Sequence, residues 1–113
     1  MHEMSLAEGI VQLIEEAAVR EGFSSVKLVA IEIGRLSMVE PEALAFCFDA
    51  VTRGSIAEGA RLEIEDVPGR GACLQCGTEA EIENLYDPCP GCGAFGLRIT
   101  SGTEMRVKEL EVD

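Results

Sequence analysis

Two short cysteine segments constrain this chain more than any other feature of its sequence. Each has the pattern Cys-X-X-Cys-Gly, at 73–77 and 89–93, and twelve residues separate the second cysteine of one segment from the first of the other. A turn of this kind directs two sulfur atoms toward one point, and the glycine supplies a backbone position free of Cβ crowding. Four thiolates suit tetrahedral zinc and leave no coordination position open for chemistry. The spacing predicts a structural zinc site formed by Cys73, Cys76, Cys89 and Cys92.

Other interpretations of the four cysteines remain open from the sequence. A rubredoxin-like iron site uses similar spacing, but such modules normally surround the iron with aromatic residues, and this chain has only one Tyr and four Phe. Four unrelated buried cysteines are a weaker alternative at this spacing. Zinc ribbons often bind nucleic acid, which requires Lys and Arg, yet no Lys or Arg occurs between Arg70 and Arg98. The acidic residues of that segment are Glu79, Glu81, Glu83 and Asp87.

The rest of the chain predicts an α+β fold. A capping box at Ser5–Glu8 and helical spacing of apolar residues predict a helix from about Leu6 to Glu21, and Pro41 at a first helical position begins a second one that ends near Arg53. Runs of alternating or β-branched residues predict three strands, at 26–33, 60–67 and 104–112. We expect a small three-stranded sheet with two helices, into which a four-cysteine zinc-ribbon module is inserted.

Changes in composition predict where the two parts divide. The segments 68–71 and 101–102 read as linkers, so residues 1–69 with 101–113 form the expected α/β domain, and residues 70–100 form the expected inserted zinc-binding domain. The fifth cysteine, Cys47, lies outside the module on the apolar stripe of the second helix, beside Leu44 and Phe48. We interpret it as a buried packing residue rather than a metal ligand.

Charge and composition narrow the functional classes. The formal net charge is −12 over 113 residues, which disfavours nucleic acid and anionic membranes and favours cations or basic protein surfaces as partners. The first residues lack the features of a signal peptide, and no apolar run reaches the ~20 residues that span a bilayer, so we expect a cytoplasmic protein. Neither a nucleophile beside a base nor a phosphate-binding loop is evident, so we expect a protein that is not an enzyme.

The only histidine of the chain is His2. The α-amine of Met1, the intervening amide nitrogen and the imidazole of His2 can close two fused chelate rings around a metal, and Glu3 adds a carboxylate beside them. Nitrogen donors of this kind suit late first-row divalent metals such as nickel and copper. On these residues alone, a terminal histidine without any function is the commoner alternative.

Several segments together resemble the HypA/HybF family of hydrogenase maturation factors. They are Met1–Ser5, Gly34–Ser37, Glu40–Leu44, the two cysteine segments and Gly102–Glu111, in the order and spacing of that family. The resemblance implies a nickel metallochaperone that binds Ni(II) at its N-terminus and delivers it to the [NiFe] hydrogenase large subunit. It maps the nickel site onto His2 and Glu3, with Met1 and Glu40 as additional candidates, and it maps zinc onto the four cysteines.

The resemblance also implies partners. A hydrogenase maturation GTPase and the hydrogenase large subunit are expected, urease accessory proteins are further candidates because some relatives serve urease, and a homodimer is a candidate assembly. Two other functional classes are less consistent with the sequence: an electron-transfer protein with iron in the cysteine site, and a zinc-ribbon adaptor without a transferable metal. In the adaptor, His2 would be dispensable.

Overall fold

The computed structural model describes residues 2–113, with side chains from Glu3 onward. The helices are α1 (His2–Glu21) and α2 (Pro41–Val51). The strands are β1 (Val26–Gly34), β2 (Arg61–Val67), β3 (Gly69–Ala72), β4 (Glu79–Ile82), β5 (Arg98–Ser101) and β6 (Met105–Val112). The chain separates into two compact units, and both helices belong to the first. The α+β class and the two-helix, three-stranded core predicted from the sequence are confirmed.

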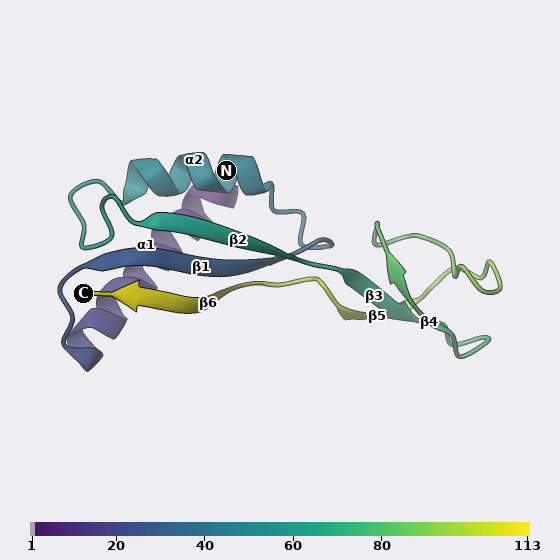
Figure 1. Ribbon diagram of the computed structural model, residues 1–113. Helices are drawn as coiled ribbons and strands as arrows, with labels where there is room; N and C mark the ends of the chain where they lie inside the picture. The colour runs from purple at the N-terminus through teal and green to yellow at the C-terminus, as the bar shows by residue number, and fades with distance from the viewer. Residues whose placement is uncertain (1) are drawn as a thin grey trace. The chain divides into compact units, whose positions relative to one another are not determined.

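The first unit comprises Met1–Ile31, Val39–Glu65 and Arg106–Asp113. Its sheet has the strand order β2-β1-β6, and α1 crosses behind these strands (Figure 1). The helices pack against each other. Fully buried aliphatic side chains from α1, β1 and α2 form the core, among them Ile14, Ile31 and Leu44. Burial of such side chains away from water is the main stabilising contribution of this unit.

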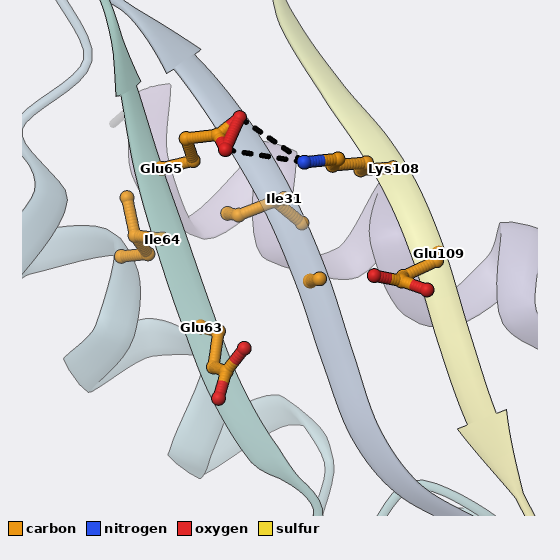
Figure 2. A pocket seen from close by; sticks show the side chains of 7 residues that line it. Ile31, Glu63, Ile64, Glu65, Lys108 and Glu109 are labelled. Atoms are coloured by element: carbon orange, nitrogen blue, oxygen red, sulfur yellow. Dashed lines mark hydrogen bonds and ion pairs between the residues drawn. The ribbon is translucent and has the colours of Figure 1, made fainter.

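The opposite face of this sheet carries charged side chains. Lys108 of β6 forms an ion pair with Glu65 of β2, at 3.1 Å between Nζ and Oε2, and the pair reaches across the central strand β1 (Figure 2). Glu63 and Glu109 lie on either side of the same shallow hollow. An exposed pair of this kind contributes little to stability, so this face is a solvated surface.

The second unit comprises Glu32–Met38 and Asp66–Met105. It contains a second three-stranded sheet of order β4-β3-β5, in which β3 pairs antiparallel with both neighbours. The sequence predicts an α/β domain of residues 1–69 with 101–113 and an inserted zinc-binding domain of residues 70–100. This assignment of domains stays a prediction.

Two local predictions were wrong. The first helix begins at His2 rather than at Leu6, so Ser5 lies inside the helix and is not its N-cap. The residues before Ser5 include no helix breaker, and Glu3 in the first turn interacts favourably with the helix dipole. Pro68–Gly71 was expected to be a linker, but most of it forms β3, because both neighbouring strands satisfy its backbone hydrogen bonds.

Two glycines allow the backbones of the second unit to approach closely. The Gly34 N–H donates to the carbonyl of Glu104 at 2.8 Å, and the Leu36 N–H donates to the carbonyl of Gly102 at 2.8 Å. A Cβ atom at Gly34 would overlap the Gly102 carbonyl group. Gly102 has φ +92°, and a Cβ there would fall 2.6 Å from the Gly69 Cα. These positions therefore exclude any side chain.

We expect Gly34→Ala to destabilise the protein by roughly 1–3 kcal/mol, because the added methyl group forces backbone to move. Chemical denaturation followed by circular dichroism measures the change. The matched control is Gly9→Ala in α1, where an added Cβ would meet nothing within 4 Å. That variant should keep or gain stability, since Ala is the better helix former by about 1 kcal/mol. Equal effects of the two variants would contradict this account of Gly34.

Candidate metal centre

The four predicted cysteines converge on one point. Their Sγ atoms all lie within 4.8 Å of one another. The Sγ atoms of Cys73 and Cys92 are 3.7 Å apart, as are those of Cys76 and Cys89. A tetrahedral zinc with bonds of about 2.3 Å places its sulfur ligands about 3.8 Å apart, whereas a disulfide needs about 2.05 Å. The donor set and its dimensions therefore fit zinc.

The two halves of the site repeat one backbone design. The Cys73 N–H donates to the Thr78 carbonyl, and the Gly77 N–H donates to the Cys73 carbonyl, at 2.8 and 3.0 Å. In the second half, Cys89 N–H donates to the Ala94 carbonyl and Gly93 N–H to the Cys89 carbonyl, both at 2.8 Å. Gly77 and Gly93 both have positive φ, 76° and 78°. This conformation is accessible to glycine at little cost, which explains the Cys-X-X-Cys-Gly pattern.

Hydrogen bonds prepare the sulfurs for a cation. The backbone N–H groups of Cys76 and Gln75, both 3.4 Å from Cys73 Sγ, lower the pKa of Cys73. Thr78, whose hydroxyl oxygen is 3.1 Å from Cys76 Sγ, lowers the pKa of Cys76 to about 6.

The last proton of the cluster is held more tightly. The backbone N–H of Ala94 lowers the pKa of Cys92, but the neighbouring sulfurs of Cys73 and Cys76 raise it more, and the result is a pKa of about 12. Several thiolates close together repel one another, so a divalent cation stabilises the fully deprotonated cluster. Metal binding should therefore release protons from these thiols.

Burial divides the four ligands into two pairs. Cys73 and Cys89 are buried, while Cys76 and Cys92 are exposed. The aromatic side chains of this unit do not surround the sulfurs, because Tyr86 is 88% exposed and Phe95 is 77% exposed. This exposure disfavours the rubredoxin-like alternative, in which aromatic residues shield an iron from solvent. Sequence reasoning missed Thr78, although its position directly after Gly77 could have suggested it.

The residues predicted to hold nickel occupy the first unit. His2 is the first residue of α1, and its side chain and all of Met1 lie outside the described part of the chain. Glu40 is the N-cap of α2, and its carboxylate accepts a hydrogen bond from the Glu42 N–H at 3.4 Å. The Glu40 N–H in turn donates to Glu3 Oε2 at 3.2 Å. The fold thus joins two candidate residues that are 37 positions apart in sequence.

Comparison with known proteins places these features in a family. The family model described as hydrogenase/urease nickel incorporation, metallochaperone, hypA matches residues 1–112. The chain belongs to the HypA family. The hydrogenase maturation factor HypA of Dechloromonas aromatica is 61% identical and that of Azotobacter chroococcum is 60% identical, each over the full length of both chains.

Solved HypA structures have the same fold. The solution structure of the Ni metallochaperone HypA from Helicobacter pylori is similar to this chain with a TM-score of 0.73 and 28% identity, covering 99% of this chain and 97% of that one. A second solution structure of a HypA protein gives a TM-score of 0.71 at 28% identity, covering 99% and 96%. The family resemblance found in the sequence is therefore confirmed.

Two further predictions can be compared with this HypA family structure. Cys47 is buried on α2, as predicted from its place on the apolar stripe with Leu44 and Phe48. Within the part of the chain that the structure describes, neither helix is both long and apolar enough to cross a membrane. Among the His, Cys, Asp and Glu side chains described between Glu3 and Asp113, the four cysteines are the group of three or more whose ligand atoms lie close enough together to hold one metal ion.

Proposed function

We propose that this HypA-family chain is a nickel metallochaperone that binds Ni(II) near its N-terminus and passes it to the [NiFe] hydrogenase large subunit during maturation. Family membership supports the general role. The observation that carries the nickel site is the hydrogen bond from the Glu40 N–H to the Glu3 carboxylate, because it brings Glu40 close to the first turn of α1.

The proposed nickel ligands are the imidazole of His2 and the carboxylate of Glu3, with the α-amine of Met1 and Glu40 as additional contributors. The first four N–H groups of a helix have no intrahelical acceptor, so helix formation does not consume the amide nitrogen of His2. A cation at a helix N-terminus is disfavoured by the helix dipole. The negative charges of Glu3 and Glu40 offset this unfavourable interaction. Because the two effects oppose each other, the affinity for the cation is moderate, which suits a metal that must be released.

The proposed role of zinc is structural. Four protein thiolates leave no open coordination position, so the zinc holds the second unit together and supplies no catalytic step. The proposed partners are the hydrogenase maturation GTPase and the hydrogenase large subunit, with urease accessory proteins as alternative recipients. Metal transfer between proteins requires no catalytic residues, which is consistent with a protein that is not an enzyme.

A transfer experiment tests this function. Purified protein loaded with nickel is mixed with the metal-free precursor of the large subunit, together with a chelator that captures any nickel released into solution. We expect nickel to appear on the precursor, because direct transfer bypasses the solvent. The control is nickel-loaded chelator in place of the protein. Nickel that goes entirely to the chelator, with or without the GTPase, would contradict the proposed delivery.

A further inference from the structure

The second unit exposes an apolar surface that the metal sites do not explain. We define this surface by Leu85, Tyr86, Phe95 and Leu97. Together with Gly96 and Ile99, these residues line a shallow cavity of about 320 Å³. Leu85 and Tyr86 also line a second cavity of about 200 Å³, together with Leu36 and Met38. Met38 in the second cavity is 80% exposed and Tyr86, which lines both cavities, is 88% exposed, so both hollows lie beside exposed apolar groups.

The aromatic members of this surface are not part of the core. The chain has five aromatic residues, and Tyr86 and Phe95 are 88% and 77% exposed. A soluble chain with so few aromatic residues gains no folding energy from leaving two of them in water. Contiguous exposed apolar surface marks interaction sites, and aromatic side chains dominate binding energy at protein interfaces.

Local hydrogen bonds hold this surface in place before any partner arrives. The carboxylate of Asp87 accepts hydrogen bonds from the N–H groups of Glu83 and Asn84, both at 3.0 Å, and so fixes the turn that carries Leu85 and Tyr86. Arg35 secures the same turn by donating to both carboxylate oxygens of Glu83, at 2.8 and 2.9 Å. A rigid surface loses less conformational entropy on binding than a mobile loop does.

The zinc site fixes the other half of the surface. Phe95 follows Cys92, Gly93 and Ala94, and the Ala94 carbonyl accepts the backbone hydrogen bond of Cys89. The position of Phe95 therefore depends on the second cysteine turn, which the metal organises. A structural zinc would therefore affect partner binding directly, because it would fix the turn that positions Phe95.

The charge around the surface specifies what binds there. Residues 71–97 contain four carboxylates and no Lys, Arg or His. With a formal charge of −12, two copies of this chain repel each other, which disfavours self-association through this surface. We propose that the surface docks a positively charged segment of a partner protein, in which an aliphatic or aromatic side chain flanked by Lys or Arg fills the cavity between Tyr86 and Phe95.

The proposal rests on the proposed function for the identity of the partners used to test it. The test variant is Tyr86→Ser combined with Phe95→Ser, in the full-length chain. The matched control is Leu74→Ser, which removes another apolar side chain of the same unit that is 74% exposed and lines neither cavity. Zinc content and nickel binding are measured first, and both should match the native protein for both variants.

Calorimetry then measures binding to the purified hydrogenase large-subunit precursor and, separately, to the purified GTPase. We expect the double variant to bind one of them at least about tenfold more weakly, since aromatic anchors carry much of the energy of an interface. Native binding should weaken as salt rises, because acidic and basic surfaces attract each other. A photo-crosslinking residue at position 86 should react with a segment that contains Lys or Arg.

Several results would overturn this assignment. Unchanged affinity of the double variant for both partners would do so, as would equal loss in Leu74→Ser. Binding that is insensitive to salt, or crosslinks to an acidic segment, would reject the proposal that the bound segment is positively charged. A native dimer that the double variant dissociates would identify a second copy as the occupant. Failure of the native protein to bind or transfer nickel would instead reject the proposed function, while partner affinity would still test the surface.

Discussion

Cys92→Ala should abolish zinc binding and unfold the second unit, while the first unit keeps its structure. Cys92 supplies one of the four proposed zinc ligands. With only three thiolates the coordination of the metal is incomplete, and the folding energy that depends on metal binding is lost. The unit has few other buried side chains: apart from cysteines and glycines, they are Ile33, Leu36 and Ile82. Metal analysis should find zinc absent, and NMR should show collapsed amide dispersion for residues 69–101.

Cys47→Ala is the matched control for this prediction. Cys47 is a buried cysteine of α2 that lies outside the cluster, so its replacement leaves a small cavity but removes no ligand. The control should therefore retain its zinc and the amide dispersion of the second unit. A Cys92→Ala protein with normal zinc content and thermal stability would contradict the four-cysteine site.

A single residue added before Met1 should weaken nickel binding strongly, although every side chain of the protein survives. The extension moves the α-amine away from His2 and breaks the fused chelate rings of the proposed site. His2→Ala should have an equal or larger effect. We expect a loss above about a hundredfold, because altered outer-shell groups alone change metal affinity by about 10–100-fold. Nickel titration by calorimetry measures the affinity, and zinc content should not change.

Two comparisons make this second prediction specific. Circular dichroism should show intact α1 in His2→Ala, since Ala is the better helix former. Glu3→Gln should lower nickel affinity, whereas Glu8→Gln, which removes an exposed carboxylate further along α1, should not. An extended protein that binds nickel as tightly as the native chain would exclude the α-amine. If His2→Ala bound nickel equally well, the site would have to lie elsewhere.

The local parts of this protein follow from its sequence because local rules govern them. The two cysteine turns need only their own residues and a glycine with positive φ, so the spacing predicted the cluster correctly. Pro41 at the first turn of α2 and the apolar stripe that buries Cys47 are equally local. Each of these features depends on residues within a few positions of one another, and the sequence displays them directly.

Other features depended on contacts between distant segments. Two of the four residues of β3 are glycine, so its intrinsic preference for a strand is low, and pairing with β4 and β5 stabilises the strand. The early start of α1 places the Glu3 carboxylate against the Glu40 N–H, 37 residues away. The exposure of Tyr86 and Phe95 likewise depends on where the surrounding turns place them. The sequence alone determined which residues are candidate metal ligands, and tertiary structure decided which distant groups meet, because long-range contacts override weak local preferences.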